Sequence, residues 1–293
     1  MQNMQNKQNI NMEVTVRTNE SRVHRPWSRE TAALCCSAKS VMVHDWVHRG
    51  VDPAFKVTQR AGEDEHVFEM VCCKELFGLV WNDVKPFLRG EVDVEFFNSF
   101  GITVATFFVS KFLHDCPMRT LTFTALCIRA GYESPLEGAR QLSVLNFKNC
   151  TMSEEALCCV AAMCAKNPVE TLWLGADVFI EQNDDCPRRE DLAEAHLVSI
   201  REGFAQAAKL KSVTLKAPHH ATQLVSAFRH CTSLRTLTLY VPFEQGIIAE
   251  LINNKSPALE VVLIDYAWPK EQVAEFREAV KQSGSGIKID VHY

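Results

Sequence analysis

A pair of apolar residues, separated by one residue, recurs along this chain at nearly regular intervals. The steps between successive pairs are 27, 24, 27, 41, 24, 25 and 27 residues. The eight pairs are Val94/Phe96, Leu121/Phe123, Leu145/Phe147, Leu172/Leu174, Val213/Leu215, Leu237/Leu239, Val262/Ile264 and Ile289/Val291. A repeat of this length is one supersecondary unit that cannot bury its apolar side alone, so we expect the units to stack on one another.

Each repeat begins with a short alternating segment and continues with a helical one, as residues 142–167 illustrate. The alternation in residues 142–147 predicts a half-buried strand. Thr151 and Glu154 then stand at the spacing of a capping box, which predicts that a helix begins there. The sequence therefore predicts an α/β fold in which strands and helices alternate.

Two departures from the regular repeat also carry information. The surplus residues of the 41-residue step fall in residues 175–191, whose polar, mixed-charge character predicts a protruding insertion loop. Six units have an apolar residue three positions before the pair, whereas the first and last units have Glu91 and Gly286 there. Because the end repeats of a stacked array are usually atypical, we place the repeat domain at residues 91–293.

The unit with the pattern L-x-x-L-x-F-x-x-C, which ends at Cys150, resembles leucine-rich repeats of the ribonuclease-inhibitor-like and cysteine-containing subclasses. The resemblance is one of motifs and covers residues 91–293, although Pro218 and Pro242 fall near the Cys150 position in two later units. It implies a solenoid with a parallel β-sheet on its concave side and helices on its convex side. It also implies a non-catalytic protein-interaction scaffold, because such repeats offer a large modular surface.

On a sheet of this kind, the side chains between the buried ones would face outward on the concave side. This outward set is rich in Thr, which strands also favour for structural reasons alone, and it includes Trp173 and Tyr240. Aromatic anchors among neutral polar positions are typical of protein-recognition surfaces, although a structural role for the two rings stays open. We expect a protein partner to bind at Val144, Asn146, Lys148, Thr171, Trp173, Thr214, Lys216, Thr238, Tyr240, Val261, Leu263 and Asp265.

The chain before the repeats has a different pattern. Residues 1–22 are rich in Asn and Gln and predict a disordered polar tail. Residues 23–90 predict a mainly helical N-terminal cap, with one helix near Ser28 and another from His66 to about Phe77. Residues 71–81 faintly resemble the end of an F-box, although the Leu-Pro start of that motif is missing. An F-box-like substrate adaptor of a ubiquitin ligase is therefore the alternative function.

Charge and composition exclude several classes of partner. The net charge of −5 divides into +4 for residues 1–60 and −9 for residues 61–293, which argues against nucleic acid. No apolar run reaches the roughly 18 residues of a membrane span, and the N-terminus lacks the apolar core of a secretory signal. We therefore expect no membrane partner, an intracellular and cytoplasmic location, and twelve cysteines that are reduced thiols.

Catalytic motifs are not evident in the sequence. It contains no phosphate-binding loop, no nucleophile elbow and no H-E-x-x-H pair. His219, His220 and His230 could be ligands, but a loop role is simpler. Three cysteines of one predicted helix are expected in the core, namely Cys158, Cys159 and Cys164. The sequence therefore predicts a protein that is not an enzyme, with no catalytic residue, metal, cofactor or small-molecule substrate.

Overall fold

The computed structural model describes the residues in the ranges 12–17, 22–26, 40–45, 54–61, 64–71, 91–97, 103–105, 118–130, 141–179, 191–217, 219–253 and 255–292. Side chains are described for residues 92–97 and, from residue 118 onward, for the same ranges. The chain forms two compact units, Met1–Asn98 and Ser99–Tyr293.

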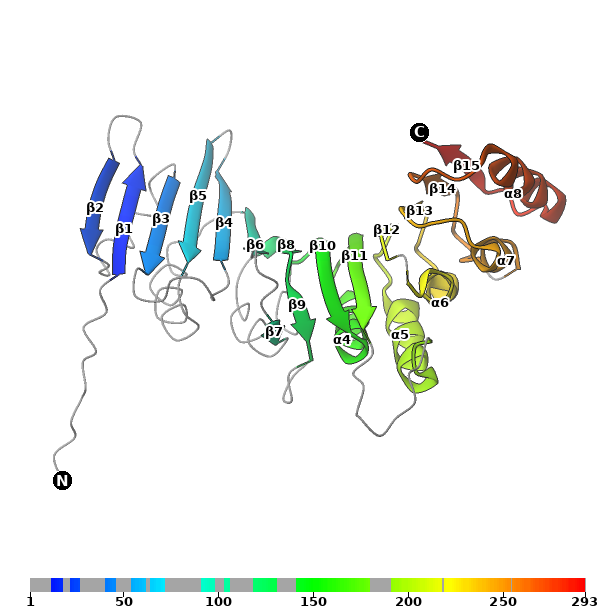
Figure 1. The fold of residues 1–293 in the computed structure, drawn as a ribbon, viewed down its shortest axis with the longest axis horizontal. Coiled ribbons are helices and arrows are strands. Elements are labelled where there is room, and N and C mark those ends of the chain that lie inside the picture. Colours follow the sequence, from blue (N-terminus) through cyan, green and yellow to red (C-terminus); the bar gives the residue numbers. More distant parts are fainter. Residues whose placement is uncertain are drawn as a thin grey trace, which may run out of the picture. The chain divides into compact units, whose positions relative to one another are not determined.

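The second unit alternates strands and helices (Figure 1). Its elements are β7 (Thr103–Ala105), β8 (Met118–Thr124), β9 (Cys127–Arg129), β10 (Val144–Ser153), α4 (Glu154–Lys166), β11 (Thr171–Phe179), α5 (Glu194–Gln206), β12 (Ser212–Leu215), α6 (Ala221–Ala227), the 3-10 turn η2 (Phe228–His230), β13 (Thr236–Leu239), α7 (Gln245–Asn253), β14 (Val261–Ile264), α8 (Lys270–Ser283) and β15 (Lys288–Val291). Within the described ranges all nine strands pair in parallel, which confirms the predicted α/β class.

Seven of these strands lie side by side in the order of the sequence, from β8 through β10 to β15, while β9 lies beside β10 and β7 beside β9. The register aligns the predicted apolar pairs with one another: Leu145 of β10 lies opposite Leu121 and Leu172, and Phe147 lies opposite Phe123 and Leu174. The same alignment continues to Ile289 and Val291 at β15. The prediction that these strands are parallel neighbours is confirmed.

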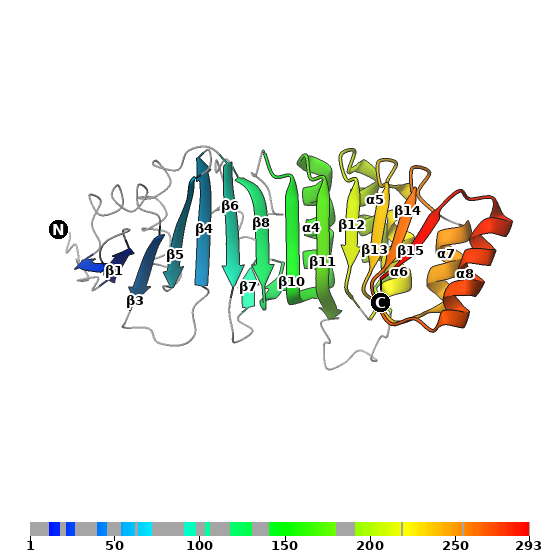
Figure 2. The same ribbon diagram turned by 90° about the horizontal axis from the view of Figure 1, so that it is seen from above.

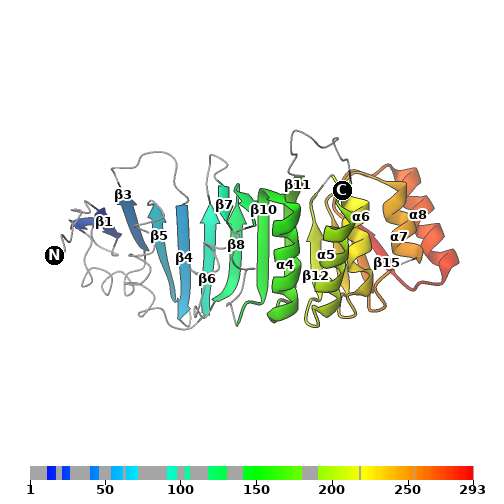
Figure 3. The same ribbon diagram turned by 90° about the horizontal axis from the view of Figure 1, so that it is seen from below.

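The helices α4 to α8 all cover the same face of this sheet, as the two opposite views in Figures 2 and 3 show. Between them and the strands lie the aligned apolar pairs, with the rings of Phe123 and Phe147 stacked at a centroid distance of 5.1 Å. The apolar residues that precede the pairs are buried as well; they are Met118, Leu142, Val169, Leu210, Leu234 and Leu259. The repeated apolar positions therefore form a continuous core beneath one face of the sheet.

The boundaries of two predicted segments move in the structure. Strand β10 continues to Ser153, because Thr151 and Ser153 still pair with β11, so Ser153 and not Thr151 caps helix α4. The Ser153 hydroxyl accepts a hydrogen bond from the Ala156 amide at 3.2 Å. Strand β11 likewise continues through Gly175 to Phe179, so the start of the predicted insertion loop at 175–191 is strand. Residues 180–190 lie outside the described ranges.

The first unit is built differently, from strands β1 (Met12–Arg17), β2 (Arg22–Pro26), β3 (Ser40–Asp45), β4 (Ala54–Ala61), β5 (Asp64–Val71) and β6 (Glu91–Phe97). These strands lie in the order β2-β1-β3-β5-β4-β6. All of these neighbours are antiparallel except β3 and β5, which are parallel. Hairpins such as β4–β5 can form with local pairing, which distinguishes this unit from the second one.

Three predictions for the N-terminal region are corrected by these strands. The predicted tail, residues 1–22, contains β1, and the predicted helical cap, residues 23–90, forms strands wherever it is described. The helix expected from His66 is strand β5 as far as Val71, because β5 pairs with β3 on one side and β4 on the other. Ser28 and residues 72–90 lie outside the described ranges. Strand β6, with Val94 and Phe96, pairs antiparallel with β4 and falls within the first unit, although residue 91 is the predicted start of the repeats.

Candidate functional site on the open face

The face of the sheet opposite the helices carries the alternate side chains of the strands, and we call it the open face (Figure 2). The strand register arranges these side chains in rows across the sheet. One row consists of Thr122, Asn146, Trp173, Thr214, Thr238, Leu263 and Asp290. Two residues further along, Thr124 lies opposite Lys148, and β10 then has a register shift relative to β11. At the corresponding position of the other strands stand Gly175, Lys216, Tyr240, Asp265 and His292.

All of the residues predicted for partner binding lie on this face, and all but one are at least partly exposed. A third row, two residues earlier along the strands, contributes Val144, Thr171 and Val261, which are half-buried. Thr214 is the exception, since its exposed fraction is only 9%. Thr214 therefore offers little surface to a partner, although it lies in the same row as Trp173, one ring of an aromatic pair.

Trp173 and Tyr240 form this aromatic pair. Their ring centroids lie 5.6 Å apart and their planes meet at 34°. Trp173 belongs to β11 and Tyr240 follows β13, so the two rings meet over the intervening strand β12. Sequence periodicity places both rings on the open face, but it does not reveal that they touch, because they are separated along the chain by an entire repeat.

Gly175 provides the space that the Trp173 indole occupies. A Cβ atom at Gly175 would lie 2.8 Å from Trp173 Nε1 and 2.6 Å from the carbonyl oxygen of Phe147 on β10. Both distances are shorter than any real Cβ contact allows. The missing side chain thus lets the indole lie flat along its own strand, and the sequence offers no sign of this role beyond the glycine itself.

The phenol of Tyr240 is held by the neighbouring strand. The Asp265 carboxylate raises the pKa of Tyr240, chiefly by hydrogen bonding to the neutral phenol, with smaller contributions from burial and from the Asp265 charge. The neutral phenol is the form that can donate, so ionisation would break the contact. Asp265 therefore fixes one end of the aromatic pair.

Polar side chains continue across the rest of the open face. The Asn146 amide donates to the Thr122 hydroxyl at 3.1 Å, which links β10 to β8. The Lys216 ammonium donates to Asn149 Oδ1 at 3.3 Å, and Asn149 adopts a left-handed backbone conformation with φ of 52°. These groups offer hydrogen-bond donors and an aromatic surface, but they include no nucleophile paired with a base.

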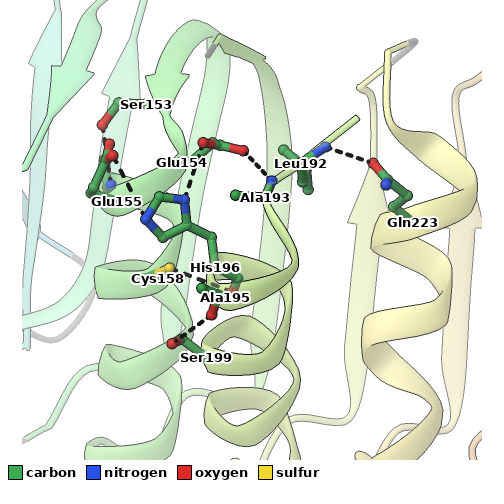
Figure 4. Close-up of polar contacts among 11 residues, drawn as sticks. Ser153, Glu154, Glu155, Cys158, Leu192, Ala193, Ala195, His196, Ser199 and Gln223 are labelled. Carbon is green, nitrogen blue, oxygen red and sulfur yellow. Dashed lines mark hydrogen bonds and ion pairs between the residues drawn. The ribbon is translucent and has the colours of Figure 1, made fainter. Parts of the chain in front are cut away.

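A second cluster lies between helices α4 and α5, as Figure 4 shows. The buried Glu154 carboxylate accepts a hydrogen bond from the Ala193 amide at 2.7 Å and contacts His196 Nδ1 at 3.0 Å. His196 Nε2 lies 3.7 Å from Glu155. The three side chains present potential metal ligands within 4.8 Å of one another, the one such group in the part of the chain that the structure describes.

The bonding of Glu154 favours a structural role for this cluster. Both carboxylate oxygens are engaged with the start of α5, where a negative charge also complements the helix dipole. Glu154 is the first residue of α4, so it connects the beginnings of two successive helices. Sequence analysis missed this contact because Glu154 and His196 are 42 residues apart. His219, His220 and His230 do not join a ligand group among the described residues.

The described cysteines are free thiols. Burial, the largest cause, raises the pKa of both Cys158 and Cys164 to about 12. These thiols therefore remain protonated near neutral pH, which opposes nucleophilic chemistry. Of the three cysteines predicted in the core, Cys164 is buried, whereas Cys158 and Cys159 are half-buried.

Comparison with known proteins does not assign this chain to a family. No protein-family model matches the chain, and no curated protein is significantly similar to it in sequence. Within the described ranges, no helix is both long enough and apolar enough to cross a membrane.

Proposed function

We propose that the second unit is a leucine-rich-repeat-like solenoid that binds a protein partner through its open face. The observation that carries the proposal is the Trp173–Tyr240 pair, which lies half-exposed on the sheet face opposite helices α4 to α8. Exposed Trp and Tyr side chains are enriched among the residues that dominate protein–protein binding energy. A sheet position that only needed a good strand former would be satisfied by Thr or Val.

The repeat geometry supports the solenoid part of this proposal. Each step from β10 to β15 adds one strand, with the apolar pairs aligned, and one helix on the same side. At the position of the family's Asn or Cys, the Cys150 thiol donates to the Phe123 carbonyl oxygen of the adjacent strand at 3.4 Å. Such side-chain bonds to the preceding unit suit a stack in which each repeat contacts its neighbours.

The shape of the surface also favours a macromolecular partner. A hollow of about 570 Å³ lies at the last strand, among Arg277, Lys281, Lys288 and apolar neighbours, and not beside Trp173. The aromatic pair lies instead on a broad sheet surface, which suits a partner with a matching broad surface. The F-box-like alternative gains no observation in its favour, because an F-box is helical and the described parts of residues 23–90 are strands.

Site-specific photo-crosslinking would test the proposal. A photoreactive amino acid at Thr238 on the open face should give discrete cross-linked proteins in an extract of the source cells. The same amino acid at Glu202, an exposed position on α5, should not give these products. The products from Thr238 should also disappear when Trp173→Ala is introduced. Equal products from both positions, or products unaffected by Trp173→Ala, would contradict binding at the open face.

A further inference from the structure

The open face concentrates hydrogen-bond donors around Gly175. On one side, the position of the Gly175 side chain lies 2.6 Å from the carbonyl oxygen of Phe147, the residue before Lys148. On the other side, the Lys216 amide donates to the carbonyl oxygen of Leu174, the residue before Gly175. Both lysines are exposed. The Trp173 indole lies over the same gap, with Nε1 2.8 Å from where a Cβ of Gly175 would be. An indole N–H and two ammonium groups are all donors without acceptor capacity.

The Lys216 side chain is already directed across this gap. Lys216 follows β12, whereas its hydrogen-bond acceptor, Asn149 Oδ1, belongs to β10. Strand β11 lies between them, so the Lys216 side chain crosses β11 at the level of Gly175. The left-handed backbone of Asn149, with φ of 52°, is part of the arrangement that presents its amide oxygen there. The exposed Lys216 side chain thus reaches toward the residue that follows Lys148.

Two carboxylates near the gap leave its positive character in place. Asp265 interacts with the Tyr240 phenol, whose pKa it raises. Asp177 follows Gly175 by two residues on β11 and is exposed. The Trp173 indole and the Phe147 carbonyl lie beside the Gly175 position, and the Lys216 ammonium reaches Asn149, the residue after Lys148.

We propose that the partner inserts a Glu or Asp side chain between Lys148 and Lys216, above Gly175, and places a neighbouring apolar side chain on the Trp173–Tyr240 pair. This inference rests on the proposed function, since it specifies the chemistry of the partner at the same face. The carboxylate accepts charge-assisted hydrogen bonds from the two ammonium groups, and the indole N–H supplies a neutral donor. The rings cover the apolar neighbour and exclude water from the bonds.

Selection from a random peptide library displayed on phage, against the full-length protein, tests this inference. We expect the selected peptides to contain Glu or Asp next to an aromatic or large aliphatic residue. A synthetic peptide of the selected sequence should lose about five- to tenfold in affinity for Lys216→Gln, and a similar factor when its own Glu is replaced by Gln. Lys148→Gln should weaken binding as well.

Two further variants separate this site from general surface charge. Lys209→Gln removes a lysine that lies outside the open face, and it should leave peptide affinity unchanged. Asp177→Asn should strengthen binding, because it removes a negative charge two residues from Gly175 on β11. Thermal unfolding of each variant verifies that the fold is retained. Weakening by Lys209→Gln equal to that by Lys216→Gln would overturn the proposal.

The possible negative results distinguish failure of the acidic-partner inference from failure of the proposed binding at the open face. Peptides that depend on Trp173 but show no preference for Glu or Asp would overturn the acidic partner and leave the open face as the binding surface. Peptides that bind Trp173→Ala as well as the unmodified protein would overturn both. A library that yields no binder would overturn an extended acidic ligand, whereas the crosslinking experiment would still decide the proposed function.

Discussion

The two faces of the parallel sheet are built from the same strands but have opposite physical roles. On the helix-covered face, Leu145, Phe147 and their aligned partners from β8 to β14 are buried and apolar. On the open face, one residue further along, the strands carry Thr, Asn, Lys, Asp and the aromatic pair. The covered face is therefore determined by packing, whereas residue choice on the open face is free to serve recognition.

Substitution on the covered face should have the largest effect on stability. Phe147→Ala removes a fully buried ring that stacks on Phe123, and we expect a loss of about 3–5 kcal/mol in the free energy of unfolding. Urea denaturation measures this quantity. The exposed Val198 of α5 offers a control, since Val198→Ala should change stability by less than about 0.5 kcal/mol.

Gly175 lies against both the backbone of β10 and the Trp173 ring, so a side chain at this position would overlap both. Gly175→Ala should lower stability by about 1–3 kcal/mol, since the new methyl group would overlap the Phe147 carbonyl and the indole. Near-ultraviolet circular dichroism should also change as the ring pair moves. At Gly286, with φ of 70° and open space around it, alanine meets only a backbone cost of about 1–2 kcal/mol and should leave that spectrum intact.

The contact between α4 and α5 extends the comparison to the helix layer. Glu154→Gln should cost about 1–3 kcal/mol, because the buried carboxylate loses its charge-assisted contacts with Ala193 and His196. Glu155→Gln alters a carboxylate that is 46% exposed and should cost less than about 0.5 kcal/mol. Chemical denaturation of both variants measures the two changes in the free energy of unfolding. Equal effects would mean that Glu154 does not connect the two helices.

Truncation on the open face should separate stability from binding. Trp173→Ala should lower stability by about 0.5–1.5 kcal/mol, the range of an aromatic pair, and should abolish partner binding. The measurement is urea denaturation alongside the crosslinking assay. A loss as large as that of Phe147→Ala would break the comparison between the faces, since Trp173 would then be a core residue.

The smallest effect concerns the ionisation of Tyr240. Because the folded state raises the pKa of this phenol, its contribution to stability is complete below the ordinary tyrosine pKa of about 10 and is lost as the pH rises through the raised value. Asp265→Asn should lower the Tyr240 pKa toward the ordinary value. Carbon-13 labelling of the tyrosine ring reports this pKa by NMR titration. An unchanged pKa would show that Asp265 does not hold the phenol.

Apolar spacing predicted the second unit much better than the first. The positions of the strands and their burial follow from the repeat, because a period of two within a repeat of 24 to 27 residues leaves few alternatives. Val94 and Phe96 show the same pair, yet they belong to an antiparallel strand. The pair alone identifies a half-buried strand, and it does not say whether the neighbour runs parallel or antiparallel.

The N-terminal strands were missed for a related reason. Phe68 and Val71 are three residues apart, which fits one helical turn, but β5 is held between β3 and β4 by pairing on both edges. Tertiary pairing overrides a short periodic signal of this kind. Similarly, Ser153 replaces Thr151 as the cap of α4, because strand pairing extends β10 by two residues beyond the expected start of the helix.

By itself, the sequence determined which residues of the repeats are buried and which strands succeed one another, because side-chain alternation is a local property of an extended chain. Only the tertiary structure decided that Trp173 touches Tyr240, that Lys216 crosses toward Asn149 and that Glu154 reaches His196. Each of these contacts joins different repeats. They depend on the spacing and register of strands and helices in three dimensions, which no local pattern encodes.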